Sequence, residues 1–245
     1  IKKNQLYAAF FSYFSGLERL LKVIAALAYA REHGKFPDFQ VLKSFGHDIV
    51  KLYEHAESLR SHSLTRTEPI KENNDDAPLD DIDNAILTFL SNFATTGRYF
   101  NLDRLTGGKK SSDPLLALEQ IAAAIYERDV KKEDRAKNET EIAAGAKTLN
   151  AFEFTTLGFT GLDGHQHTTE EALVINSSFE EVRPYLIWRL AGLVKRFWNF
   201  LGILSYGNHE NLSEDIPIMH EFIGFTYCEW KFVVDDEDWP SNAVS

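Results

Sequence analysis

Apolar residues recur every three to four positions over most of this chain, which is the spacing of one face of an α-helix. The first such stripe is long and regular, and it comprises Leu6, Phe10, Tyr13, Leu17, Leu20, Ile24 and Leu27. We expect this helix to end near Gly34, because glycine suits a helix C-terminus and Pro37 cannot continue the hydrogen-bond ladder. A short turn or helix over 39–45 should follow.

The same pattern and the usual start and stop residues predict a series of further helices. They are expected from His47 to about Leu59, from a cap at Asp81 or Asp83 to the Gly97–Phe100 corner, from Pro114, from Thr168, after Pro184 as far as Leu204, and from Pro217 to Trp230. Between Glu127 and Glu141 most residues are charged, with both signs mixed, which indicates a solvent-facing helical extension.

Strand-like residues are confined to one stretch, where phenylalanine alternates with threonine and glycine at 152–161. We therefore predict an all-α bundle of about six or seven helices, with at most a short hairpin near residues 151–162. The expected segments are a helical bundle over 1–126, a charged helical connector over 127–150 and a C-terminal helical part over 151–245. The alternative is that both helical parts form one continuous domain.

The charge balance narrows the classes of partner. The 245 residues carry a formal net charge of -11, which argues against bulk attraction to nucleic acid or anionic lipid, although a local basic patch remains compatible with it. Cys228 is the only cysteine, so no intrachain disulfide is expected and a reducing, cytoplasmic setting is predicted. The apolar segments 1–31 and 185–206 are interrupted by charged residues, so we expect neither a leader nor a membrane segment.

Three short motifs follow one another in the N-terminal part: Leu20-Leu21-Lys22, Gly46-His47-Asp48-Ile49 and Gly97-Arg98-Tyr99-Phe100. Over about residues 1–105 this order resembles the HEPN superfamily of small helical domains, whose members show a Leu-Leu-Lys helix, a His-Asp helix start and an aromatic-basic helix end. The resemblance implies a homodimer. In the ribonuclease members it also implies a metal-independent cleft that presents an arginine followed four to six residues later by a histidine.

This sequence departs from the ribonuclease pattern at that arginine-histidine pair. Arg60 and His62 are too close in the chain, and Arg19 and His33 are too far apart. An imidazole that moves the 2'-hydroxyl proton and a guanidinium that stabilises the phosphorane are both needed for that chemistry. The resemblance therefore implies a binding relative without the nuclease activity.

His47 and Asp48 also resemble the His-Asp pair of the metal-dependent HD phosphohydrolases, which makes these two residues the candidate catalytic groups. Carboxylate and imidazole are competent metal ligands, and His33, His55 or His62 could complete such a site, although no spacing compels it. The alternative metal set is His33, His47 and Asp48. The competing interpretation is that Asp48 stabilises a helix N-terminus while His47 makes a local hydrogen bond. We favour this second interpretation and expect no metal.

A second candidate for metal binding is the segment Gly164-His165-Gln166-His167. Its two histidines lack a third ligand at a compelling spacing, so no metal site is expected there either.

The most basic stretch of the chain follows the Gly97–Phe100 corner. Its candidate contacts to RNA or another partner are Arg98, Tyr99, Arg104, Lys109 and Lys110. Although Thr106-Gly107-Gly108-Lys109 has some likeness to a phosphate loop, the leading glycine is missing and no strand precedes it, so no nucleotide cofactor is expected.

Together these observations predict a cytoplasmic, non-catalytic helical protein without cofactors. The resemblance to the HEPN superfamily further implies a homodimer that works by self-association and by binding a protein or RNA partner. The alternatives are the metal-dependent phosphohydrolase and a purely structural scaffold.

Overall fold

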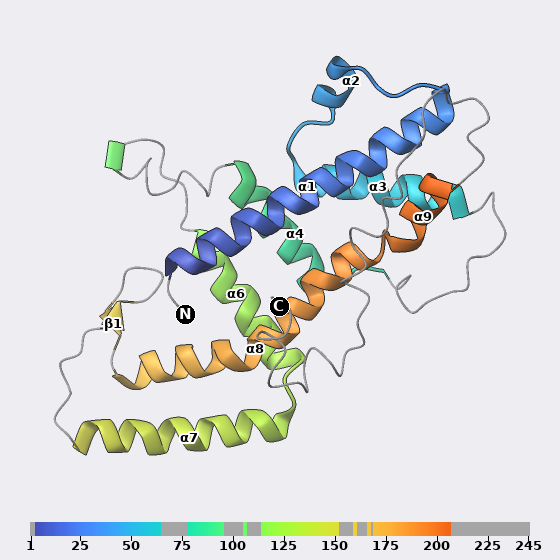
Figure 1. Cartoon of the computed structure of the whole chain (residues 1–245). Coiled ribbons are helices and arrows are strands. Elements are labelled where there is room, and N and C mark those ends of the chain that lie inside the picture. Colours follow the sequence, from blue (N-terminus) through green and yellow to red (C-terminus); the bar gives the residue numbers. More distant parts are fainter. Residues whose placement is uncertain are drawn as a thin grey trace, which may run out of the picture. The chain divides into compact units, whose positions relative to one another are not determined.

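The computed structural model describes residues 3–64, 78–95, 105–106, 114–151, 159–160, 166–167 and 169–206. Its helices are α1 (Lys3–His33), α2 (Phe39–Ser44), α3 (Ile49–Leu64), α4 (Asp81–Thr95), α6 (Pro114–Arg128), α7 (Lys132–Ala151), α8 (Thr169–Lys195) and α9 (Trp198–Tyr206) (Figure 1). Helices account for most of these residues, so the all-α fold class is confirmed.

The strand-like stretch forms a minimal antiparallel pair. Strand β1 (Phe159–Thr160) pairs with β2 (Gln166–His167), and Phe159 lies opposite His167. The first strand lies inside the range predicted for a hairpin, 151–162, and the second lies just beyond it.

The chain divides into two compact units. The first contains α1 from Tyr7, α2, α3, α4 and the chain from Leu190 through α9, whereas the second contains α6, α7, the β1–β2 pair and α8 up to Arg189. Helix α8 therefore belongs partly to each unit. Each unit is built from separate stretches of the sequence, whereas the predicted segments 1–126, 127–150 and 151–245 are continuous. Those three segments stay a prediction.

In the first unit, α1 packs its apolar stripe against aromatic side chains of α4. Phe10 meets Phe89 edge to face with 4.9 Å between ring centroids, and Phe14 meets Phe93 in the same way at 5.9 Å. Such pairs add to the stabilisation that comes from burying apolar area. The predicted end of the helix is confirmed, because Gly34 has a φ of 68° and its N–H donates to the Ala30 carbonyl at 2.9 Å.

The start of α4 corrects one detail of the sequence prediction. The cap is Asp80 rather than Asp81 or Asp83, since Asp80 Oδ1 accepts from the Asp83 N–H at 2.9 Å. In return, Asp83 Oδ2 accepts from the Asp80 N–H at 3.3 Å. This reciprocal pair is a capping box, which satisfies two backbone donors that a helix start leaves without partners.

One face of α3 holds the end of α8. The Tyr53 hydroxyl donates to the Leu193 carbonyl at 3.1 Å, and the Tyr53 ring lies edge-on to Phe197 with 5.1 Å between centroids. That carbonyl lacks its usual partner, because the Phe197 N–H donates instead to Val194 at 3.1 Å. Burial raises the pKa of the Tyr53 hydroxyl, so it remains a donor throughout the neutral range.

An ion cluster joins α3 to Arg196, the residue after α8. Its α3 members are Glu57 and Arg60, which lie one and two turns after Tyr53 on the same face. Arg196 donates through Nε and Nη2 to the two carboxylate oxygens of Glu57, at 3.2 and 3.1 Å, and Arg60 donates to Glu57 at 2.9 Å. The two arginine side chains are 10% exposed and the glutamate 22%, so these charges are largely removed from water. Desolvation alone would raise the pKa of Glu57, but the hydrogen bonds from the arginines hold it below its ordinary value.

The helix boundaries in the C-terminal part differ from the prediction. A helix was predicted to begin at Thr168 and another to run from Pro184 to Leu204, but α8 is continuous through Pro184 and the break lies at 196–197. Proline removes one backbone donor, and the neighbouring buried Val182 and Tyr185 keep the helix together across it.

In the second unit, α6 begins at Pro114, which confirms the predicted proline at the first helical position. The charged stretch predicted to extend this helix instead follows a short turn and forms α7, whose side chains are mostly exposed. On α7, Asn138 is buried and bonded to Ser177 on α8 and to Tyr126 on α6. Arg189 also pairs with Asp129 at 2.9 Å.

We expect Tyr53→Phe to lower the free energy of unfolding by about 1 kcal/mol, because the buried Leu193 carbonyl loses its hydrogen bond. Tyr13→Phe is the matched control: the Tyr13 hydroxyl donates to the Leu190 carbonyl at 2.7 Å, and that carbonyl also has a helical partner inside α8. Urea unfolding followed by circular dichroism should therefore show a larger loss for Tyr53→Phe. Equal losses would contradict the role of Tyr53 at the helix end.

Glu57→Gln should cost about 3 kcal/mol of unfolding free energy, since it leaves two largely buried arginines without a counter-charge.

A carboxylate whose pKa is lowered on folding stabilises the protein above its unfolded pKa, and this contribution disappears as pH falls through the lower folded pKa. Stability of the original protein should therefore fall below about pH 5, where glutamate begins to bind protons in the unfolded chain. The fall should be shallower in Glu57→Gln. An identical pH profile in the two proteins would be inconsistent with a paired, ionised Glu57.

Candidate functional site

The His-Asp motif lies in the turn that leads into α3. Gly46 has a φ of 69°, in the left-handed region that favours glycine, and its N–H donates to the Lys43 carbonyl at 3.1 Å. The glycine thus turns the chain after α2, and His47 and Asp48 then precede the first helical residue, Ile49.

Asp48 caps α3 and links it to α4. Its Oδ1 accepts from the N–H groups of Val50 and Lys51, at 3.1 and 3.3 Å, and from the Ser91 hydroxyl at 2.9 Å. The Ser91 oxygen in turn accepts from the Ile49 N–H at 3.2 Å. Desolvation would raise the pKa of Asp48, but the hydrogen bonds from Ser91 and the Lys51 backbone hold it below its ordinary value. This confirms a capping carboxylate at the helix start.

His47 points to another helix. Its Nδ1 lies 2.9 Å from Glu18 Oε1 on α1, and Glu18 also pairs with Lys22 at 2.8 Å. The His47 side chain is 76% exposed, whereas that of Glu18 is 16% exposed. Desolvation would raise the pKa of Glu18, but hydrogen bonds from Lys22 and His47 lower it. The imidazole therefore joins the α3 turn to the middle of α1.

The alternative metal set is not assembled. His33 lies at the end of α1, stacked on Tyr29 with 3.9 Å between ring centroids. Glu18, which contacts His47, lies fifteen residues earlier on the same helix, or roughly 22 Å along its axis. His33 and His47 are therefore too far apart to share an ion. Among the described residues no group of three or more metal-ligating side chains comes together.

The predicted RNA or partner contacts Arg98, Tyr99, Arg104, Lys109 and Lys110 lie outside the described residues. The same holds for the Gly97–Phe100 corner, the helix predicted over 217–230, Cys228 and His165. His167 is described, as part of β2.

Two features of this region could not be predicted from local sequence patterns. The contacts of Asp48 with Ser91 and of His47 with Glu18 join residues 43 and 29 positions apart, and no local pattern links them. The second feature is a pair of exposed aromatic side chains, Phe36 and Phe39, before and at the start of α2. Phenylalanines on both sides of Pro37 were the available clue.

The chain was compared with protein-family models, curated proteins and solved structures, and none of the three comparisons gave a match. Among the residues that the structure describes, no helix has both the length and the apolar character needed to cross a membrane.

We expect Asp48→Ala to destabilise the fold by about 1–2 kcal/mol, because it removes the cap of α3 and the acceptor for Ser91. Asp48→Asn should cost less, since the amide oxygen can still accept from the backbone. His47→Ala should change stability by less than about 0.5 kcal/mol, as expected for an exposed pair. Thermal or urea unfolding of the three variants gives this order. A large effect of His47→Ala with little effect of Asp48→Ala would contradict the role of Asp48 as the cap of α3.

Proposed function

We propose that this chain is a non-catalytic, HEPN-like helical module that acts by self-association and by binding a partner macromolecule, in the first place a protein. The observation that supports the proposal is the use of His47 and Asp48. Asp48 caps α3 and His47 contacts Glu18 on α1, so the one motif with a chemical precedent has a structural explanation.

The side chains of Asp48 and His47 contact different helices, which supports a structural role rather than metal binding. Asp48 contacts Ser91 on α4, whereas His47 contacts Glu18 on α1. A metal-binding His-Asp pair would have to present both groups to one ion. Here the two groups bind different helices, and Asp48 Oδ1 already accepts three hydrogen bonds.

The all-α fold is compatible with the HEPN-like resemblance, from which the homodimer follows as part of the proposal. The formal net charge of -11 favours a protein over a polyanion as the principal partner. RNA remains the second partner class, because the basic stretch from Arg98 to Lys110 supplies cations and an aromatic ring in one segment.

Sedimentation equilibrium tests self-association directly. The purified protein should have the mass of a dimer at about 100 μM, a concentration that populates complexes of micromolar affinity. His47→Ala should dimerise with the same dissociation constant and should contain no less metal than the original protein. Stoichiometric manganese, iron or zinc that disappears in His47→Ala would instead favour the phosphohydrolase alternative. If the protein has the mass of a single chain at all concentrations, the proposed self-association is excluded.

A separate measurement addresses RNA. Fluorescence anisotropy with a single-stranded oligonucleotide should show weak, salt-sensitive binding if the basic stretch contacts RNA. Combining Arg98→Ala, Lys109→Ala and Lys110→Ala should then reduce the affinity. The control is Lys131→Ala with Lys132→Ala, which removes two exposed charges from the turn before α7 and its first residue. Equal binding by the original and the triple variant would exclude this stretch as the contact.

A further inference from the structure

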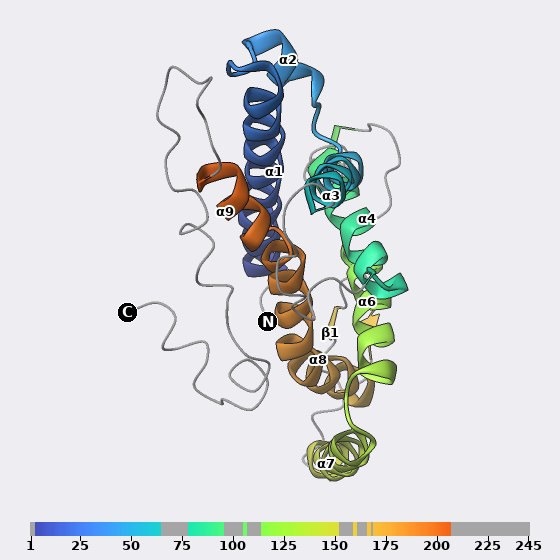
Figure 2. The ribbon, with the colours of Figure 1, turned by 90° about the vertical axis from the view of Figure 1, so that its right-hand side faces the viewer.

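Helix α2 lies in an arm of the chain, defined here as residues 35–45 and called the α2 arm. Gly34 and Gly46 bound it, with φ values of 68° and 69°. Because both glycines occupy the left-handed region, the chain turns sharply into the arm and out of it. Figures 1 and 2 show α2 standing apart from the ribbons of α1 and α3 in both views.

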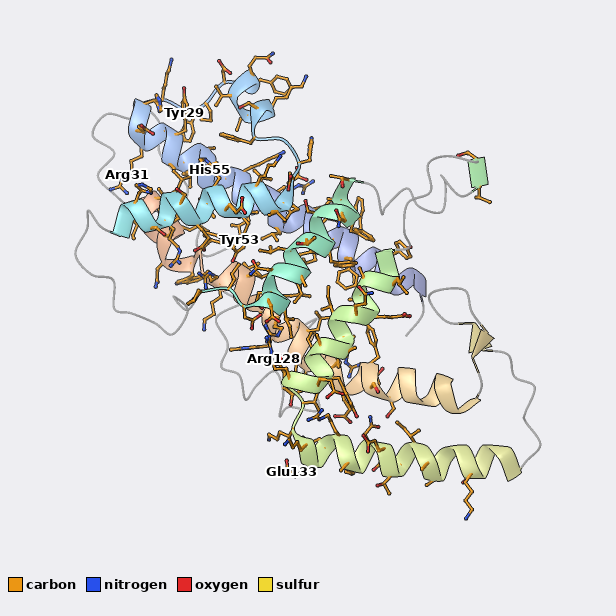
Figure 3. All side chains as sticks on the ribbon, turned by 180° about the vertical axis from the view of Figure 1, so that it is seen from behind. Tyr29, Arg31, Tyr53, His55, Arg128 and Glu133 are labelled. Atoms are coloured by element: carbon orange, nitrogen blue, oxygen red, sulfur yellow. The ribbon has the colours of Figure 1, made fainter. Side chains whose placement is uncertain are left out.

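Local hydrogen bonds fix the conformation of this arm. Asp38 Oδ1 accepts from the Val41 N–H at 2.9 Å and so caps α2, and the Ser44 hydroxyl donates to the Val41 carbonyl at 2.6 Å. Near the two ends, Pro37 is buried and the Phe45 ring lies 6.3 Å from that of His55 on α3. Figure 3 shows His55 and Tyr53 on the same helix, and only Tyr53 is buried. The arm is therefore held at its ends.

The middle of the arm exposes apolar surface. No residue of α2 is buried, and Phe39 is 72% exposed. Phe36 is 37% exposed, and Val41 and Leu42 are only half-buried. A lone exposed apolar residue is ordinary, but neighbouring ones on an ordered segment indicate a contact surface.

The charge of the arm differs in sign from that of the chain. Lys35 and Lys43 are exposed, and neither forms an ion pair within the described part of the chain. The single acid of the arm, Asp38, is engaged as the cap of α2. The arm is thus locally positive on a chain whose formal net charge is -11. Its charge therefore complements an acidic partner, and a second copy of this chain, with its formal net charge of -11, is one.

We propose that the α2 arm docks on the acidic surface of a second copy of this chain, with Phe36 and Phe39 as its apolar contacts and Lys35 and Lys43 as its ionic ones. Two copies that exchange arms reciprocally form a closed dimer. Direct arm-to-arm packing would bring the lysines of the two copies together, which electrostatic repulsion disfavours. This inference rests on the self-association proposed above and names the surface responsible for it.

The test measures the dimer dissociation constant of variants by sedimentation equilibrium. Phe36→Ser combined with Phe39→Ser should raise this constant about tenfold or more, as for central apolar contacts of an interface. Phe11→Ser is the matched control, because Phe11 is also an exposed phenylalanine, 50% exposed, but lies on α1. The control should leave the dissociation constant unchanged. Unfolding curves confirm that the arm variants remain folded.

The ionic contacts are tested by charge reversal. Lys35→Glu with Lys43→Glu should weaken the dimer several-fold at low salt, and the effect should shrink at about 0.5 M salt, where exposed charges are screened. Lys131→Glu with Lys132→Glu changes the net charge equally at a different exposed position and should have a smaller effect.

A photocrosslinking amino acid at position 39 identifies what the arm contacts. In a mixture of two copies that differ in mass, we expect crosslinks between copies. A dimer whose dissociation constant is the same in the arm variants as in the original protein would overturn the arm as the contact while leaving self-association intact. Crosslinks confined to single chains would do the same, whereas a purely monomeric original protein would overturn both proposals.

Discussion

The first unit depends on how the carboxylate of Glu57 is satisfied. A glutamate that is largely removed from water needs its counter-charges close by, and Arg60 and Arg196 supply them at 2.9–3.2 Å. Arg60 is on the same helix, so it imposes no constraint on the rest of the chain. Arg196 is 139 positions away, and its pairing fixes the residue that follows α8 against α3. The end of α8 is consequently set by a charge on another helix.

The other contacts at this corner follow from that position. With Arg196 held on α3, the Phe197 N–H donates to Val194, and the Leu193 carbonyl is left without its helical partner. The Tyr53 hydroxyl supplies the missing donor. Tyr53 and Glu57 lie four positions apart on α3, so the same face of one helix provides both the ionic and the neutral contact. Phe197 then turns into the core, where it is fully buried.

This dependence explains which parts of the fold could be predicted from the sequence. The end of α1 at Gly34, the start of α6 at Pro114 and the helix start beside Asp48 have local causes, and each was predictable from a few neighbouring residues. The break between α8 and α9 has no such cause. The apolar stripe from Leu186 to Leu204 keeps its helical spacing across residues 196 and 197, so the sequence indicates one helix there. Conversely Pro184, a usual breaker, lies inside α8 because buried neighbours outweigh the loss of one hydrogen bond. The roles of Ser91 and Glu18 likewise come from tertiary contacts that no local pattern records.

The His-Asp motif and the α2 arm show two different uses of residues next to each other in the chain. Asp48 caps a helix and His47 contacts Glu18 on α1, so their chemical groups contribute to the fold itself. The arm contributes little to it: α2 buries no side chain, yet caps and two left-handed glycines hold it in one conformation. Ordering eleven residues costs conformational entropy, and the exposed surface of Phe36 and Phe39 returns no burial energy in the isolated chain. That surface gains burial energy only when another surface covers it. Under the proposal made above, a second copy that covers the arm would supply this burial energy.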